Sequence, residues 1–383
     1  RIRIRAGERW PLHVVLHGRG GTLNEVSFIA QHDGKPASPD QSWIQLDVFG
    51  RTNNAYRFSG ETDVFEAIAD VKRDFPVDER RITLRGFSMG GAGAWHLGLH
   101  YPSFWSSVGP GAGFVDFYNY QKQSERRPPW QHAALHVYDA VDYAENAFNV
   151  PICTYGGELD KQLVASTSMV EAAAQSGVEI KLLIGKGMGH KFHPDSFREY
   201  MAFHRLHSEQ GRPETGAGGE IRFVTYTPKY HRCGWLALEE MERIYKPARV
   251  VSRLDESGCL CLTTGNARVL SIDRTAAENV ELDGRRFSMP SLGDPNSKAV
   301  RFERRDGNWT RLDGSAGREF SDGRELRKRH NLQGPIDDAF MEPFVCIRGT
   351  GRPWSPRQAE WSAWTLERFE REFDKWLRGR VPV

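Results

Sequence analysis

Apolar and polar residues follow two different periods along the first 207 residues of the chain. Short apolar or β-branched runs predict buried strands, and longer stretches with apolar positions every three or four residues predict helices. The expected strands are 11–17, 43–49, 81–84, 106–113 with its loop, 150–155 and 178–184. The expected helices are 61–75, a helix from 92 that stops at Tyr101-Pro102, 162–175 and 194–207. Because strands and helices alternate, this part predicts an α/β fold with a doubly wound, mostly parallel sheet.

The pattern changes after residues 211–220, which are rich in Gly, Pro and polar residues and mark a domain boundary. Beyond this linker the apolar runs are short and separated by turns. They cover 221–227, 248–253, 258–263, 267–273, 280–287 and 299–304. Asp283-Gly284 and Asp306-Gly307 are hairpin signals within this region. Residues 221–333 therefore predict a small all-β module.

Two further segments stand apart from these patterns. Residues 114–149 are irregular and aromatic, and their length exceeds an ordinary connection, so we expect a lid or insertion over a site. Residues 334–383 predict one strand at 344–347 and an amphipathic helix at 356–377. We therefore divide the chain into a hydrolase-like part (1–210), the linker, the β module and a C-terminal segment that resembles an incomplete further domain.

Composition limits the classes of function. The chain has 383 residues, enough for two domains, and its 52 Lys and Arg nearly balance 50 Asp and Glu. This balance argues against a general nucleic-acid binder, and no apolar run is long enough to cross a bilayer. None of the five cysteines forms a C-x-x-C pair, so no metal or cofactor is implied. We expect Cys259 and Cys261 to be small buried hydrophobic residues on a strand. The chain begins at Arg1 rather than Met, so we expect its native start to lie further upstream.

The first candidate for chemistry is a serine. Gly86-Phe87-Ser88-Met89-Gly90 reads G-x-S-x-G, between the expected strand at 81–84 and a small-residue helix. A serine in that position sits on a tight strand-to-helix turn, where the neighbouring glycines avoid steric clashes and the hydroxyl is exposed. Ser88 is therefore the expected nucleophile.

A serine nucleophile needs a base and an acid that orients the base. Asp160 and His190 each follow an expected strand, and both loops contain glycines that let the chain turn back toward the serine. The order Ser88, Asp160, His190 is that of α/β-hydrolases. Glu158 is the rival acid and ranks lower because it lies closer to its strand. His193 is the alternative base, but its position before Pro194 favours a helix cap or lid contact.

The remaining site residues would hold the oxyanion and the substrate. We expect the N–H of Met89 to be one oxyanion donor, and that of Arg19, or else Gly20, to be the other. A phosphate cradle is the alternative for this glycine-rich loop, but its spacing does not match a nucleotide-binding motif. Trp130 and Tyr118 are candidates for substrate binding.

Three residues on the helix after Ser88 have less specific interpretations. Trp95 could line the pocket but is better explained as a core residue beneath the helix. His96 and His100 are expected to be surface or packing residues.

Residues 9–207 resemble bacterial α/β-hydrolases of the esterase and "predicted peptidase" type, which are relatives of feruloyl and acetyl-xylan esterases and of prolyl oligopeptidase. The matching stretches are His17–Gly21, Gly86–Trp95, Tyr101-Pro102, Gly157–Asp160 and Gly189-His190. The resemblance implies that Ser88, Asp160 and His190 are the catalytic triad. It also favours a secreted or periplasmic protein. The β module loosely resembles the trailing modules of large secreted proteins of this kind.

These observations predict a serine hydrolase that cleaves carboxylic esters of small molecules or carbohydrates through an acyl-enzyme, without a cofactor, a nucleic acid or a membrane as partner. Two alternatives stay open. One is a peptidase of the prolyl oligopeptidase type, and the other is a non-catalytic binding protein on a hydrolase scaffold.

Overall fold

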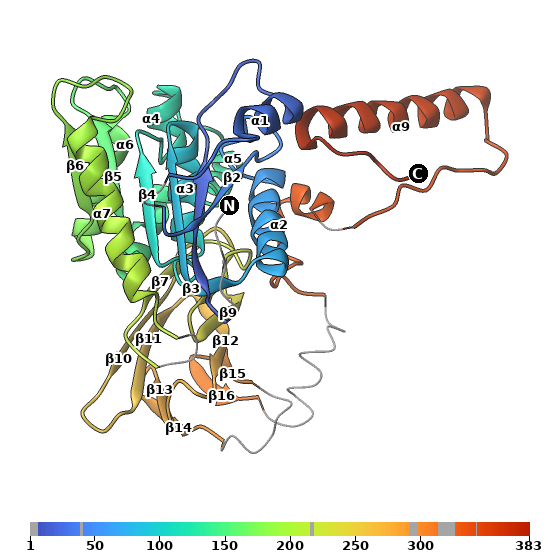
Figure 1. Cartoon of the computed structure of the whole chain (residues 1–383). Coiled ribbons are helices and arrows are strands. Elements are labelled where there is room, and N and C mark those ends of the chain that lie inside the picture. The colour runs from blue at the N-terminus through green and yellow to red at the C-terminus, as the bar shows by residue number, and fades with distance from the viewer. Residues whose placement is uncertain (1–6, 39–40, 215–217, 291–297, 313–325, 342) are drawn as a thin grey trace.

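The computed structural model describes residues 7–38, 41–214, 218–290, 298–312, 326–341 and 343–383 (Figure 1). Residues 215–217 of the expected linker lie outside the described residues. The described part contains one six-stranded sheet with helices on both faces, two five-stranded sheets below it, and a long C-terminal helix that stands apart (Figure 1).

The six-stranded sheet is formed by the first half of the chain, and all of its strand pairs are parallel. Its strand order is β2-β1-β3-β4-β5-β6. The strands are β1 (Trp10–Leu16), β2 (Ile44–Val48), β3 (Val77–Phe87), β4 (Ser107–Gly111), β5 (Cys153–Gly157) and β6 (Lys181–Gly185). The doubly wound parallel sheet expected from the sequence is therefore confirmed. Its strand order reverses beside β1, and the carboxyl ends of the strands meet at one edge, where ligands bind in such sheets.

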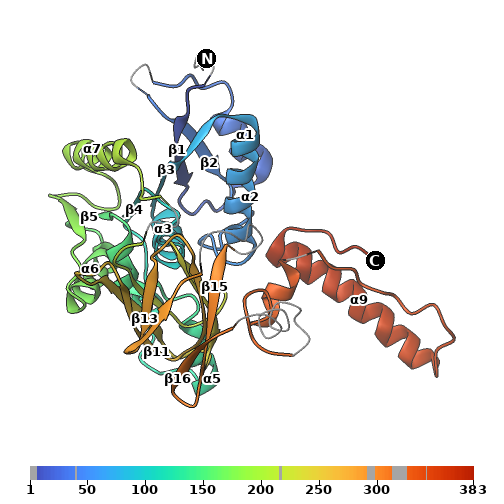
Figure 2. The same cartoon turned by 90° about the horizontal axis from the view of Figure 1, so that it is seen from below.

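Helices cover the two faces of this sheet unequally (Figure 2). The helix α7 (Pro194–Gln210) packs across β3, β4, β5 and β6. The opposite face carries α2 (Ser59–Asp74), α3 (Met89–His100) and α6 (Leu163–Gln175), whose buried side chains share one hydrophobic core with β1 and β3. The helix α3 is buried along its whole length, because glycines and alanines let it approach the sheet closely.

The sequence pattern missed several short helices. The helix α1 (Glu25–His32) begins with a capping box in which Asn24 and Ser27 exchange side-chain and main-chain hydrogen bonds of 3.0 Å. The segment 114–149 is not irregular, since it forms α4 (Phe117–Gln121), α5 (Pro129–Leu135) and the 3₁₀ helix η1 (Ala140–Asn149). These helices are too short for a clear period, and tertiary packing against α3 and α6 accounts for η1.

The second half of the described chain forms two sheets around a separate core. One has the order β14-β13-β11-β10-β7 and the other the order β16-β15-β12-β9-β8. The strands are β7 (Arg222–Thr225), β8 (Arg232–Cys233), β9 (Leu236–Met241), β10 (Ala248–Leu254), β11 (Leu260–Gly265), β12 (Ala267–Asp273), β13 (Asn279–Leu282), β14 (Arg285–Ser288), β15 (Ala299–Arg305) and β16 (Asn308–Arg311). Apolar side chains of both sheets meet in this core, among them Phe223, Leu238 and Phe302.

The hairpin expected at Asp283-Gly284 is confirmed, because these residues adopt positive φ values of 47° and 87° and turn the chain between β13 and β14. The run 280–287 is therefore divided into two strands. The strand β9 was not expected, because Glu239 and Glu240 interrupt its apolar pattern. In the structure the carboxylate of Glu240 is buried and paired with Arg327 at 2.8 Å.

The C-terminal segment contains η2 (Ile336–Phe340) and α9 (Pro356–Leu377). The helix at 356–377 is present as expected, and Phe340 and Phe344 pack against its residues Phe369 and Phe373. The strand expected at 344–347 is not formed, because no neighbouring strand pairs with it among the described residues. No helix in the described ranges has the length and apolar character needed to cross a bilayer.

Candidate active site

Ser88 occupies the turn between β3 and α3. Its φ and ψ values of 59° and −120° are strained for a residue with a side chain. The turn is held by a hydrogen bond of 2.8 Å from the Ser88 N–H to the Gly111 carbonyl. A Cβ atom on Gly86 would lie 2.3 Å from the Gly90 carbonyl oxygen, and one on Gly90 would lie 1.9 Å from the Leu16 carbonyl oxygen. The flanking glycines are therefore required by close main-chain contacts.

The structure brings His190 and Asp160 to this serine. His190 Nε2 lies 2.8 Å from Ser88 Oγ, and His190 Nδ1 lies 2.7 Å from Asp160 Oδ2. The Asp160 side chain is only 5% exposed, whereas that of His190 is 43% exposed. Asp160 Oδ1 also accepts a hydrogen bond from the Gln162 N–H at 2.9 Å. The carboxylate is thus fixed from two sides, while the imidazole is partly exposed to solvent.

The rival acid and the alternative base have other partners. Glu158 Oε2 accepts a hydrogen bond of 2.7 Å from the Gly187 N–H, which ties the loop after β5 to the loop after β6. His193 caps α7, because its Nδ1 accepts a hydrogen bond from the Asp195 N–H at 3.2 Å. Neither side chain is hydrogen-bonded to Ser88 or His190 among the described residues.

The expected oxyanion donors lie around Ser88, but they are not equivalent. Met89 is the first residue of α3, where a main-chain N–H has no partner within the helix. The N–H of Gly20 donates a hydrogen bond of 3.2 Å to Asn53 Oδ1. Met89 and Arg19 line the same cavity as Ser88, and Gly20 does not. The Gly20 N–H is thus already bonded to Asn53, whereas Arg19 borders the cavity.

A cavity of about 390 Å³ opens beside Ser88. Its walls come from the loop before α2, the start of α3, the segment around α4 and the residue before α6. The lining residues are Arg19, Asn53, Asn54, Ala55, Arg57, Phe58, Ser88, Met89, Phe114, Asp116, Phe117, Tyr120, Gln121 and Gln162. The segment 114–149 therefore borders the site through its first eight residues.

The two expected substrate-binding residues are not among those that line this cavity. The Trp130 side chain is 71% exposed on α5. The Tyr118 hydroxyl is hydrogen-bonded to His132 Nδ1 at 3.2 Å. The expected aromatic lining is supplied instead by Phe58, Phe114 and neighbouring rings of α4. The sequence did not predict these positions, because a helix as short as α4 has too few residues for its hydrophobic pattern to show which face points to the cavity.

The aromatic and histidine side chains of α3 are buried. Trp95 is fully buried, in agreement with its expected core position. His96 and His100 are not surface residues, because both are buried and pack against Tyr230 of the β module. His96 Nε2 lies 2.7 Å from the buried carboxylate of Glu61. These side chains hold α3 against its neighbours and do not reach the cavity.

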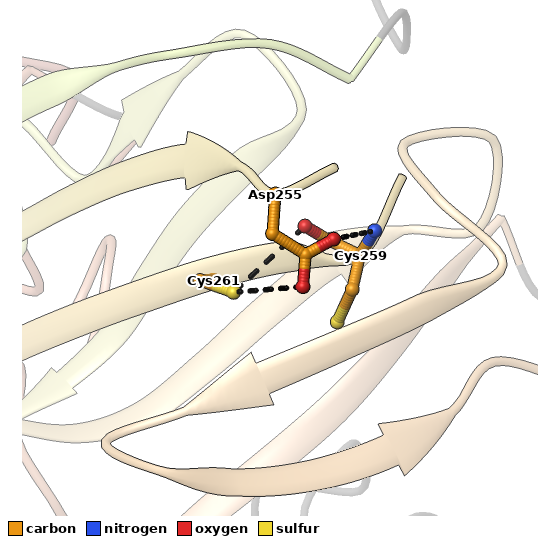
Figure 3. Close-up of side chains that lie close together, drawn as sticks. All are labelled: Asp255, Cys259 and Cys261. Atoms are coloured by element: carbon orange, nitrogen blue, oxygen red, sulfur yellow. Dashed lines mark hydrogen bonds between the residues drawn. The ribbon is translucent and has the colours of Figure 1, made fainter. Parts of the chain in front are cut away.

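A second group of polar side chains lies far from this site, at the turn between β10 and β11 (Figure 3). Potential metal-binding atoms of Asp255, Cys259 and Cys261 lie within 4.8 Å of one another. However, Asp255 Oδ1 accepts hydrogen bonds from the main-chain N–H groups of Ser257 and Cys259, both at 2.9 Å. Asp255 Oδ2 faces Arg286 at 3.3 Å. The carboxylate therefore closes the turn. Cys259 is buried as expected, whereas Cys261 is partly exposed.

Residues 53–207, less than half of the chain, match the prolyl oligopeptidase family. The chain is also 26% identical over 184 residues to NocK of Nocardia uniformis subsp. tsuyamanensis, which is named as an esterase. That match covers 44% of this chain and 52% of NocK, so the chain spans about half the length of this relative.

Solved structures with a similar fold have low sequence identity. An S-formylglutathione hydrolase from Agrobacterium tumefaciens is 17% identical, with a TM-score of 0.40 over 53% of this chain and 85% of that one. A puromycin-hydrolyzing peptidase from Mycobacterium tuberculosis is 16% identical, with a TM-score of 0.41 over 54% of this chain and 35% of that one.

The parallel sheet, the strained serine turn and the matched family agree with one another. The first half of the chain therefore has an α/β-hydrolase fold, and its residues 53–207 are similar to the prolyl oligopeptidase family.

Proposed function

We propose that this chain hydrolyses carboxylic esters through an acyl-enzyme formed on Ser88. The observation that carries the proposal is the hydrogen-bonded series from Ser88 Oγ to His190 (2.8 Å) and from His190 to Asp160 (2.7 Å). An ionised carboxylate can only accept hydrogen bonds, so Asp160 selects the imidazole tautomer with a proton on Nδ1. His190 Nε2 is then free to accept the serine proton.

The reaction follows from these positions. Ser88 Oγ attacks the ester carbonyl while His190 Nε2 takes the hydroxyl proton, and the N–H groups of Met89 and Arg19 bind the oxyanion. His190 then gives the proton to the departing alcohol, which leaves an acyl-Ser88 ester. Water, deprotonated by His190, releases the acid. Asp160 orients the imidazole and stabilises its charged form throughout.

The test is a panel of short acyl, feruloyl and sugar-acetyl esters, assayed with the native chain and with Ser88→Ala. A fluorophosphonate probe followed by peptide mapping reports the nucleophile directly. We expect ester hydrolysis that falls by about 10⁴-fold or more in the variant, and labelling at Ser88. Hydrolysis that survives the substitution would refute the proposed nucleophile.

A peptidase is the second candidate, because the matched family is that of prolyl oligopeptidase. The same three side chains would serve an amide substrate, whose leaving group also takes its proton from the histidine. Aminoacyl p-nitroanilides assayed beside the corresponding p-nitrophenyl esters separate the two. Comparable kcat/KM values for the anilide and the ester would favour the peptidase.

A further inference from the structure

Arg57 is one of the residues that line the cavity containing Ser88. It precedes Phe58 and α2, and its Nη2 donates a hydrogen bond of 2.8 Å to the main-chain carbonyl of Tyr138. Its guanidinium also lies 5.5 Å from the centre of the Phe114 ring and 5.8 Å from that of Tyr138. These contacts hold the guanidinium in place and exclude water from its faces.

The charge of Arg57 lacks an ion-pair partner within the described ranges. The Tyr138 carbonyl is the one acceptor found for the guanidinium there, and the buried Nε has none. A guanidinium has five N–H donors, and a buried charge is normally paired. Asp139 is the acid that most favours the charged form of Arg57, but burial raises the pKa of Asp139 to about 7. No hydrogen bond or ion pair joins the Asp139 carboxylate to Arg57 among the described residues, and Asp139 Oδ1 is buried without a hydrogen-bond partner there.

Asp116 also lines the cavity but forms no ion pair with Arg57 among the described residues. Its two carboxylate oxygens cap α4 by accepting hydrogen bonds from the Asn119 main chain at 2.7 Å and side chain at 2.8 Å. Arg19 adds a second cation, and its side chain is exposed at the rim. The cavity therefore combines aromatic walls with an excess of positive charge beside the serine.

We propose that the ester substrate carries a carboxylate, and that Arg57 binds it while the ester carbonyl lies at Ser88. This inference rests on the proposed function. Arg57 is partly exposed and is held in place by the Tyr138 carbonyl and the Phe114 ring, so an entering carboxylate gains charge-assisted hydrogen bonds without further ordering of the arginine. A neutral ester of the same size leaves Arg57 without a partner.

Two pairs of substrates test the proposal. p-Nitrophenyl hemiglutarate and p-nitrophenyl hexanoate differ in charge on the acyl side. 4-Acetoxybenzoate and 4-acetoxybenzamide differ on the alcohol side. Each is assayed with the native chain, Arg57→Met, Arg57→Lys and Arg73→Met, an exposed arginine of α2 as a matched control. The measured quantity is the ratio of kcat/KM for the charged substrate to that for its neutral partner.

In one of the pairs we expect a ratio above about ten for the native chain and Arg73→Met, and a ratio at least about ten-fold lower in Arg57→Met. Arg57→Lys should keep part of the preference, since it keeps the charge. The pair that responds identifies the side of the ester that carries the carboxylate. Ratios near one in both pairs, or ratios that Arg57→Met leaves unchanged, would overturn the proposal.

A binding measurement separates this inference from the proposed function. Calorimetry with Ser88→Ala compares the affinities of all four compounds, and the double variant Ser88→Ala/Arg57→Met tests their dependence on the arginine. Tighter binding of a charged compound that the double variant loses supports the carboxylate site even if no ester is hydrolysed. Hydrolysis without a charge preference in assay or calorimetry would leave the proposed function standing and refute the site.

Discussion

Two carboxylates follow β5, and their hydrogen bonds give them different roles. Asp160 faces His190 and is almost fully buried, whereas Glu158 ties two loops together through the Gly187 N–H. From the sequence, Asp160 ranked above Glu158 as the acid that orients the base, because Glu158 lies closer to its strand. The hydrogen bonds give the physical reason for this ranking. Only Asp160 can fix the imidazole tautomer that accepts the serine proton.

The substitution Asp160→Asn should lower kcat for ester hydrolysis by about 10³–10⁴-fold, because an amide can donate to Nδ1 and favour the wrong tautomer. KM should change little, since Asp160 does not line the cavity. Steady-state kinetics on a p-nitrophenyl ester measure both. The matched control is Glu158→Gln, which keeps an oxygen acceptor for Gly187 and should retain kcat within about three-fold. A larger loss in Glu158→Gln than in Asp160→Asn would reverse the assignment.

Individual residues differ in how far the sequence could predict them. Ser88, Asp160 and His190 each come shortly after the carboxyl end of a strand, and a parallel sheet brings these loops to one edge. Arg57 offered no such signal, because its significance depends on the lack of an ion pair among the described residues and on rings from residues 114 and 138. That environment arises from tertiary packing between segments distant in sequence, and no local pattern encodes it.

At the scale of elements, long periodic segments were predictable and short ones were not. The strands of the parallel sheet and α2, α3, α6 and α7 appear close to their expected bounds, because burial on one or both faces sets their pattern. The helices α4 and α5 and the strand β9 gave weak patterns, and their conformation depends on partners elsewhere in the chain. The strand expected at 344–347 failed for the converse reason, since an apolar run needs a neighbouring strand.

The contact between η1 and β7 shows how such partners act. The strand β7 lies at the edge of its sheet, and its outer main-chain groups bond to asparagine side chains of η1. Asn146 Oδ1 accepts from the Val224 N–H at 2.8 Å, and Asn146 Nδ2 donates to the carbonyls of Val224 (2.9 Å) and Leu99 (2.8 Å). One buried side chain therefore connects η1, α3 and β7.

The substitution Asn146→Leu should lower the free energy of unfolding by about 2–4 kcal/mol, because it leaves buried main-chain groups of Val224 without partners. Denaturant unfolding followed by tryptophan fluorescence gives this value. The exposed Asn308 at the start of β16 provides the control, and Asn308→Ala should cost about 1 kcal/mol or less. Equal costs for the two variants would mean that the bridge to β7 contributes little.

At the scale of the whole molecule, both the parallel-sheet part and the β module contain a histidine whose pKa is lowered by burial. His13 in β1 is buried and stacks on Trp43 with ring centres 4.6 Å apart. Burial first, and then the charges of Arg85 and Arg205, lower its pKa from 6.5 to about 3. In the β module, burial and the neighbouring His330 and Arg232 lower the pKa of His231 to about 3 as well.

A lowered pKa means that the unfolded chain binds protons more readily than the folded one. The stability that each histidine contributes is therefore complete above pH 6.5 and falls as the pH drops from 6.5 toward 3, by about 1.4 kcal/mol per pH unit.

The substitution His13→Phe keeps a ring against Trp43 and removes this titration. Its unfolding free energy, measured by denaturant titration between pH 4 and 6, should depend less steeply on pH than that of the native chain, by up to the same 1.4 kcal/mol per pH unit. The exposed Asn308, which has no titratable side chain, offers the control Asn308→Ala, which should retain the native slope. If His13→Phe also retained the native slope, the pH dependence of stability would have to arise from other groups. Removing a histidine that binds a proton only in the unfolded chain over this pH range must make the unfolding free energy depend less steeply on pH.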